Sequence, residues 1–263
     1  MSEHQSADTM HVAVGRPWKD AIVSVLDPGS TLRPWSASGD VTPGDSIVAT
    51  VETDPVSVFA AVGVVGPDRD LHTALAGNWK LCFSGLLELN TVTMMTGGAL
   101  SSRGLSRYHR RGSGAVRDVL DGAAGPTADT LFGHTSLAAA RVLLKSEGRC
   151  SACHDPLNLT GDTARNRFEI HTAGHDTTDF PADWPAVLCT SCHARMRRQG
   201  QTSFLDFIFS LHPRCPRCGA QQAMSAMYGM PAGPVEEPWI AALGCVITEP
   251  RAEWCCGQCG HRW

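Results

Sequence analysis

The sequence is poor in lysine and has no overall positive charge. Its 263 residues include 22 Lys or Arg and 26 Asp or Glu, for a formal net charge of −4, and lysine occurs only at positions 19, 80 and 145. This balance excludes the overall basic character typical of many nucleic-acid-binding proteins. Coding bias explains part of the excess of arginine over lysine, but not its clustering. Arginine gathers in two places, as Arg103, Arg107, Arg110, Arg111 and Arg117, and as Arg195, Arg197 and Arg198.

Long apolar runs are also absent. No run reaches the roughly 20 residues of a membrane span. The first residues, MSEHQSADTMH, lack the charged-then-apolar pattern of a secretory signal. We therefore expect a cytoplasmic protein without a membrane partner. The length is sufficient for two or three compact domains.

Cysteine, by contrast, is plentiful, with 11 residues that fall mostly in Cys-x-x-Cys pairs. In a cytoplasmic chain this pattern favours metal binding over disulfides. The pairs Cys150/Cys153 and Cys189/Cys192 predict one structural zinc site, because each pair places two thiolates on one tight turn. Four cysteine ligands leave no open coordination position, so this zinc cannot perform chemistry itself.

A second pair of knuckles lies near the C-terminal end of the sequence. Cys215/Cys218 and Cys256/Cys259 are each followed by a glycine, which permits the positive φ that such a turn requires. Their separation by a β-like segment resembles a zinc ribbon, which we assign to residues 211–263. Cys255 could replace Cys256 by a slip of one residue, so the sequence leaves that ligand open.

A histidine-bearing segment lies between the first two knuckles. It reads FEIHTAGHD at 168–176, and the second knuckle is followed directly by His193. This arrangement resembles the zinc-stapled HNH nucleases, which have the ββα-metal fold, and we assign it to residues 129–210. The resemblance implies that a histidine near the end of the strand, here His171, activates water. It also implies that His193 binds a catalytic divalent cation.

The match to this family is imperfect at the end of the strand. The family usually has two functional residues there, one for metal and one as the base, whereas this chain has His171 followed by Thr172. Either His171 is the base and its metal-binding neighbour is missing, or His171 is the ligand and the base is elsewhere. His175 is the obvious substitute for the missing group. Asp183 lies near the position where the family has a mid-loop asparagine.

Hydrolysis of a phosphodiester accounts for these residue types. It requires a water that loses a proton near neutral pH, where histidine titrates, and a cation that neutralises charge on the phosphate. We therefore expect two structural Zn²⁺ ions and one catalytic Mg²⁺, Mn²⁺, Co²⁺ or Ni²⁺ in a metal-dependent endonuclease. The alternative is a non-catalytic, zinc-containing nucleic-acid-binding protein whose HNH core is degenerate.

The first hundred residues read as a small, mostly β barrel. Strands are expected at 11–14, 46–51 and 56–65, with further β-like pieces at 80–83 and 87–94. The run 21–26 is either a helix or a strand. Trp35 precedes the turn Pro43-Gly44-Asp45, and the combination resembles EVE and other PUA-like, SRA-related domains. Members of that group read modified bases, and several are fused to HNH nucleases.

This second resemblance implies a reader domain at residues 1–110 that binds double-stranded DNA with modified cytosine, and hence a restriction function. A flipped base requires aromatic faces on which to stack. The candidates are Trp18, Trp35, Phe59 and Trp79, with Arg107 and Arg110 as phosphate contacts. For each aromatic residue the alternative is that it fills the barrel core. A homodimer is an open option.

The remaining segments connect these parts. Residues 111–128 read as a linker, because the stretch is rich in Gly, Ser and Arg. Thr135 is placed to cap a helix over 137–145, a basic helix follows the second knuckle, and the apolar run 204–209 reads as a core helix. The predicted fold class is α+β, with a PUA-like barrel, a zinc-stapled ββα-metal domain and a zinc ribbon.

Overall fold

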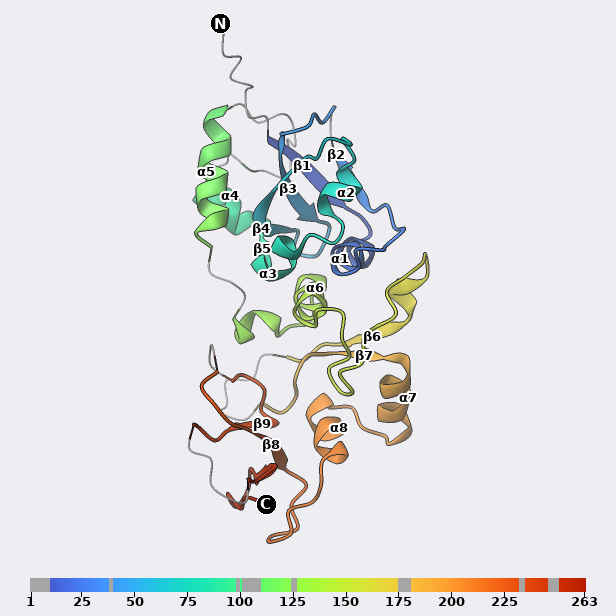
Figure 1. Cartoon of the computed structure of the whole chain (residues 1–263), viewed down its shortest axis with the longest axis vertical. Helices are drawn as coiled ribbons and strands as arrows, with labels where there is room; N and C mark the ends of the chain where they lie inside the picture. The colour runs from blue at the N-terminus through green and yellow to red at the C-terminus, as the bar shows by residue number, and fades with distance from the viewer. Residues whose placement is uncertain are drawn as a thin grey trace, which may run out of the picture.

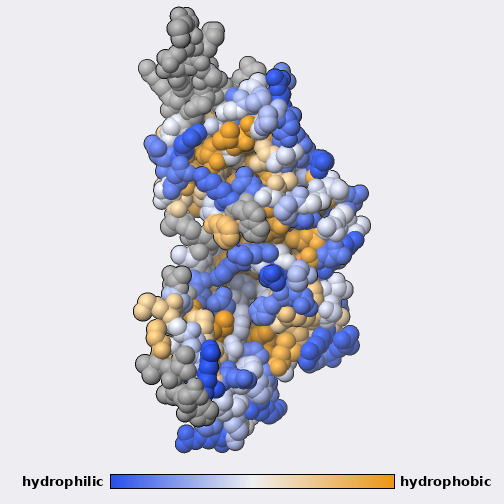
Figure 2. Space-filling view, viewed as in Figure 1, coloured by the Kyte–Doolittle hydropathy of each residue, from blue (hydrophilic) through white to orange (hydrophobic). Residues whose placement is uncertain are grey.

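The computed structural model describes residues 10–37, 40–97, 100, 110–123, 127–174, 181–231, 235–245 and 251–263. It is an elongated α+β molecule, with an N-terminal sheet and its helices at one end and the C-terminal ribbon at the other (Figure 1). No helix in these ranges is long and apolar enough to cross a membrane. The face shown in Figure 2 is largely hydrophilic and carries separate apolar patches.

The N-terminal part is built on one mixed sheet. Its strands, in the spatial order β2-β1-β3-β4-β5, are Trp35–Ala37, Met10–Gly15, Ser46–Val51, Ser57–Val64 and Leu86–Glu88. β1 and β3 pair in parallel, and all other neighbours are antiparallel. The described strands therefore form an open sheet, which differs from the closed barrel that the sequence predicts.

Helices cover both faces of this sheet, which is why its strands are apolar almost throughout. One face packs on α1, α2 and α3, which are Trp18–Leu26, Leu71–Leu75 and Trp79–Ser84. The other face packs on α4 and α5, which are Leu89–Met95 and Arg110–Asp121. Side chains that alternate along β1 follow this division, with Ala13 in the first core and Val12 in the second.

Three segments differ from their sequence predictions. The β-like run 80–83 is helix α3, which Asn78 caps by accepting hydrogen bonds from the backbone N–H groups of Lys80 and Leu81. The run 87–94 divides into the end of β5 and helix α4. Part of the predicted linker 111–128 is helix α5, whose buried Val116 and Leu120 pack on the sheet. Short apolar runs fit a helix and a strand equally well, so periodicity alone cannot separate them.

The middle part contains a strand–strand–helix unit, which further helices precede and follow in the sequence. It contains η1 (Ala128–Leu131), α6 (Ser136–Lys145), η2 (Ala164–Asn166), β6 (Phe168–His171), β7 (Ala186–Cys189), α7 (Thr190–Arg198) and α8 (Phe204–Leu211). β6 and β7 are antiparallel, with His171 opposite Ala186. Thr135 caps α6 as the sequence predicts, because its side chain accepts the backbone N–H of Ala138.

The ribbon adds a small three-stranded sheet. Its strands are β8 (Ala223–Met227), β9 (Ile240–Ala242) and β10 (Trp254–Cys256), with β8 in the centre. Trp239 attaches this part to the middle one, because its ring lies edge-on against Trp184 at 5.9 Å and Phe204 at 5.4 Å.

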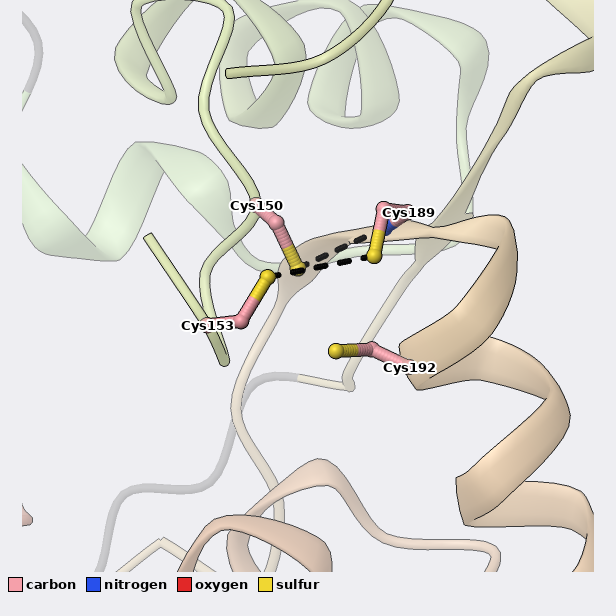
Figure 3. A group of neighbouring side chains, drawn as sticks. All are labelled: Cys150, Cys153, Cys189 and Cys192. Atoms are coloured by element: carbon pink, nitrogen blue, oxygen red, sulfur yellow. Dashed lines mark hydrogen bonds between the residues drawn. The ribbon is translucent and has the colours of Figure 1, made fainter. Parts of the chain in front are cut away.

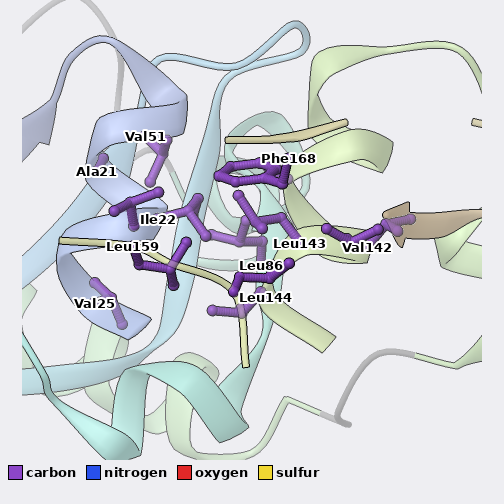
Figure 4. Close-up of a cluster of buried hydrophobic side chains, with 14 of the residues drawn as sticks. Ala21, Ile22, Val25, Val51, Leu86, Val142, Leu143, Leu144, Leu159 and Phe168 are labelled. Carbon is purple, nitrogen blue, oxygen red and sulfur yellow. The ribbon is translucent and has the colours of Figure 1, made fainter. Parts of the chain in front are cut away.

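The sheet unit and the middle part share one hydrophobic core. Ile22 and Val25 of α1 belong to the same buried cluster as Leu143 of α6 and Phe168 of β6 (Figure 4). An ion pair between Arg165 of η2 and the buried Asp20 of α1 crosses the same boundary. The boundary that the sequence predicts near residue 128 therefore does not separate two independent cores.

Candidate functional site

Four cysteines from the two predicted knuckles converge at the middle part. The sulfur atoms of Cys150, Cys153, Cys189 and Cys192 all lie within 4.8 Å of one another (Figure 3). Cys153 Sγ and Cys189 Sγ are 3.9 Å apart. Tetrahedral zinc with Zn–S bonds of about 2.3 Å separates its sulfurs by about 3.8 Å, whereas a disulfide brings them to about 2.0 Å. The group therefore has the dimensions of a structural zinc site.

Backbone contacts hold the first knuckle against the second. Ser151 N donates to Val187 O at 2.8 Å, and Val187 N donates to Ser151 Oγ at 3.0 Å. Cys189 N donates to the sulfur of Cys150 at 3.4 Å. The knuckle is therefore attached to β7 immediately before that strand leads into α7, and a zinc ion would fix the start of α7 relative to β6.

The acid–base properties of this cluster fit a bound dication. Burial opposes ionisation of Cys189, but hydrogen bonds from the Ser191 hydroxyl and the Cys192 backbone outweigh it and lower the pKa of Cys189 to about 7. Burial, together with the neighbouring Cys150, raises the pKa of the Cys192 thiol. The Cys189 thiolate forms readily, whereas ionisation of Cys192 requires a nearby positive charge, which a zinc ion would supply.

The second predicted site is also confirmed as a four-cysteine cluster. Cys215 Sγ lies 3.7 Å from Cys259 Sγ, and Cys218 Sγ lies 3.6 Å from Cys256 Sγ. Cys255 is buried but lies outside the cluster, so the ligand that the sequence leaves open is Cys256. Both groups can hold a structural zinc ion.

A histidine–carboxylate pair lies at the end of β6. His171 Nε2 is 2.7 Å from Asp183 Oδ2. The other carboxylate oxygen of Asp183 accepts the backbone N–H groups of Trp184 at 2.8 Å and Phe204 at 2.7 Å. Partial burial opposes ionisation of Asp183, but these hydrogen bonds outweigh it and hold the pKa of its carboxyl below the usual range. A carboxylate only accepts hydrogen bonds, so an uncharged His171 carries its proton on Nε2, and its Nδ1 has no hydrogen-bond partner among the described residues.

His171 and His193 line one cavity of about 320 Å³. His193 belongs to the first half of α7 and is half-buried. The cavity therefore brings the end of β6 and the start of α7 together, as the sequence predicts. Its remaining lining residues are Glu169, Ile170, Leu188, Met196, Arg197, Gln201 and Thr202.

A complete cation site is not preformed among the described residues. Within those ranges, the only groups of three or more clustered His, Cys, Asp or Glu side chains are the two four-cysteine sites. His175, the predicted substitute ligand or base, lies outside the described residues. The catalytic cation thus remains a prediction, with His193 as its described candidate ligand.

The aromatic residues predicted to stack on a base include two core residues. Phe59 is completely buried and Trp35 is 4% exposed. Trp35 donates its indole N–H to Ser24 Oγ at 2.9 Å and packs on Phe59. Neither presents a face to a ligand, so their prediction as stacking residues is wrong, and the core alternative holds for both.

Of the other predicted substrate-binding residues, only Trp18 has a described side chain. Trp18, at the start of α1, is half-buried, with Lys19 Nζ 5.8 Å from its ring. Trp79 and Arg110 lie in α3 and α5, and their side chains are outside the described set, as is all of Arg107. These three assignments stay predictions.

The sequence pattern assigns no role to Gln201 or Thr202, includes Arg197 only as a member of an arginine cluster, and marks Asp183 only by its position in the chain. Asp183 is 12 residues from its partner His171, on the far side of a loop, and no residue spacing signals such a pair. An acidic residue shortly before β7 was the available clue. Gln201 and Thr202 reach the cavity only because α7 ends with a tight turn.

Comparison with family models, curated proteins and solved structures finds no match for this chain. The functional assignment therefore rests on the geometry of the cavity and on the sequence pattern around it.

Proposed function

We propose that the chain is a metal-dependent endonuclease that hydrolyses DNA phosphodiesters. One observation carries the proposal. His171, oriented by Asp183, lines the same cavity as His193, within a strand–strand–helix unit that a four-cysteine cluster can staple. A positioned histidine in a cavity beside a second histidine is the arrangement that water activation next to a bound phosphate requires.

The roles of the two histidines follow from their hydrogen bonds. Because Asp183 occupies Nε2 of His171, Nδ1 is the atom that accepts a proton from the attacking water. Asp183 then stabilises the imidazolium that forms, since its own carboxyl stays ionised. In this proposal His171 acts as the base, and its hydrogen bond to Asp183 supports that choice among the alternatives that the sequence leaves open. A divalent cation held by His193 would neutralise charge on the scissile phosphate.

Positive charge near the cavity favours a polyanionic substrate. Arg195, Arg197 and Arg198 are exposed on the helix that carries His193, and Arg197 also lines the cavity. Arginine binds phosphate through two parallel hydrogen bonds, so these side chains suit contacts to a nucleic-acid backbone. These three arginines give the surface near the cavity a local positive charge, although the net charge of the whole chain is −4.

The preference for modified cytosine is the finer part of the proposal. It is supported by the resemblance of the first hundred residues to PUA-like readers, and Trp18 is the half-buried aromatic candidate of that unit. Comparing cleavage of methylated and unmethylated plasmid at one fixed salt concentration tests it, because salt alone changes affinity for DNA.

A non-catalytic zinc protein that binds nucleic acid is the second candidate. It is favoured by the incomplete set of cation ligands among the described residues. Absence of cleavage of any methylated or unmethylated DNA with Mg²⁺, Mn²⁺, Co²⁺ or Ni²⁺, together with retained DNA binding, would establish it in place of the nuclease.

The decisive experiment compares His171→Ala and His193→Ala with the wild-type protein in a plasmid-cleavage assay. We expect both changes to abolish cleavage and to leave zinc content and DNA binding intact, because loss of a general base alone costs about 100- to 10,000-fold in rate. His154→Asn is the matched control. His154 is exposed, lies outside this cavity and has a φ of +60°, which asparagine tolerates. Wild-type rates in both alanine variants would exclude this site.

A further inference from the structure

The turn between α7 and α8 is held in a fixed shape at its first end. Gly200, with φ of +68°, donates its N–H to Arg197 O at 3.0 Å, and Gln201 donates its N–H to Met196 O at 3.2 Å. These two bonds form a Schellman motif, which satisfies the last carbonyl groups of a helix and fixes the direction of the chain beyond it. The backbone of Gln201 is therefore positioned before any ligand binds.

The second end of the turn is tied to the catalytic pair. Ser203 caps α8 through Asp206 N and donates its hydroxyl to Ala182 O at 3.2 Å. The next residue, Phe204, donates its N–H to the Asp183 carboxylate that holds His171. The turn and His171 are therefore both hydrogen-bonded to Asp183, which fixes the position of the turn relative to His171.

The side chain of Gln201 presents an unsatisfied acceptor in this setting. Its Oε1 atom is buried and has no hydrogen-bond partner among the described residues, and the side chain lines the cavity of His171 and His193. Buried polar atoms in folded proteins nearly always have a partner, so an unpaired acceptor in a cavity requires an explanation. Rotation of this side chain toward the cavity would let a donor on the substrate supply the missing bond.

We propose that Gln201 determines base specificity by accepting a hydrogen bond from an exocyclic amine of a base beside the scissile phosphodiester. The inference rests on the proposed nuclease function and adds a specificity residue to it. In the major groove adenine and cytosine present such an amine, whereas guanine and thymine present only acceptors there. A contact in the major groove therefore selects adenine or cytosine over guanine or thymine at one position. The amide N–H₂ of Gln201 adds a donor, which fits adenine well.

Arg197, which also lines the cavity, has a different role in this proposal. We assign its guanidinium to a phosphate, and a phosphate contact carries no direct sequence information. Loss of Arg197 should weaken binding to all sequences equally, whereas loss of Gln201 should change the preference between sequences. The two variants thus separate a base contact from a backbone contact.

The test uses the full chain with both zinc sites loaded and a short DNA duplex with a randomised segment. Bound DNA is selected at one salt concentration without added catalytic cation and then sequenced, and the ends of cleaved products are sequenced in parallel. We expect the wild-type protein to disfavour guanine and thymine at one position by roughly 5- to 100-fold, the range of one good base contact. Gln201→Ala should remove this preference, and Gln201→Glu, which keeps an acceptor, should retain it.

Gln199→Ala is the matched control, because Gln199 lies in the same turn but is exposed and outside the cavity. Zinc content and melting temperature confirm that each variant is folded. An unchanged preference in Gln201→Ala, equal weakening for all sequences, or no preference in the wild-type protein would each overturn the inference while the nuclease function stands. A wild-type protein that neither binds nor cuts DNA would instead remove the proposed function, and this inference with it.

Discussion

Replacing Asp183 by asparagine should reverse the tautomer of His171. One carboxylate oxygen of Asp183 accepts two backbone N–H groups, from Trp184 at 2.8 Å and Phe204 at 2.7 Å. In Asp183→Asn the amide oxygen must take that position, because an NH₂ group there would face two donors. The amide NH₂ then points at His171 Nε2, which can accept its hydrogen bond only if the ring proton moves to Nδ1.

The expected loss of activity follows from this change. With its proton on Nδ1, His171 can no longer take a proton from water at that atom. A misplaced base should therefore slow cleavage by roughly 100- to 10,000-fold, which corresponds to about 3–5 kcal/mol in the activation barrier. The hydrogen bonds to Asp183 become neutral instead of charge-assisted, so we also expect a loss of about 1–3 kcal/mol in the free energy of unfolding.

Two measurements check this prediction. NMR of the imidazole nitrogens reports the tautomer of His171 directly, and a plasmid assay reports the rate. Asp206→Asn is the control, because the same substitution is made in the first turn of α8, away from His171. Retention of the Nε2–H tautomer in Asp183→Asn, together with a wild-type rate, would refute the reasoning.

The pH dependence of stability supplies a second check with a definite sign. The pKa of Asp183 is lowered in the folded protein, so its contribution to stability is present above the unfolded-state pKa of about 3.9 and is lost as pH falls through the folded value. The stability difference between the wild-type protein and Asp183→Asn should therefore be constant near neutral pH and shrink below about pH 4.

Two further predictions concern the metal sites and the core. Metal analysis should give two zinc ions per chain. Cys150→Ser should unfold the middle part, since structural zinc supplies folding energy directly. Cys256→Ser should lose one zinc ion, whereas Cys255→Ser should keep both. Equal zinc content in the Cys255 and Cys256 variants would contradict the ligand assignment. Phe168→Ala should lower the free energy of unfolding by about 3–5 kcal/mol. Because Phe168 packs in the core shared with α1, calorimetry should show the sheet unit and the middle part melting together, and two separate transitions would contradict a shared core.

A shared core also changes how the N-terminal part should be tested. Residues 1–110 lack α6 and β6, which supply Leu143 and Phe168 to the core around α1 (Figure 4). Exposing such a core costs about 25 cal/mol for each Å² of apolar surface. Binding of modified DNA is therefore better measured with the whole chain than with that fragment.

The sequence by itself determined the features that depend only on residues close together in the chain. The Cys-x-x-Cys spacing places two thiolates on one knuckle, so both four-cysteine sites could be predicted together with their ligands, apart from the choice between Cys255 and Cys256. The capped, periodic helix α6 and the β-branched strands β3 and β4 were likewise predictable, because their local preferences agree with their tertiary environment.

Only the tertiary structure decided the features that depend on contacts between distant residues. Trp35 and Phe59 became core residues because helices cover both faces of the sheet. Asp183 reaches His171 across a loop, and Gln201 reaches the cavity through the turn after α7. Residue type and spacing encode what one turn of chain can bind, whereas the pairing of side chains across loops is set by packing, which no local pattern records.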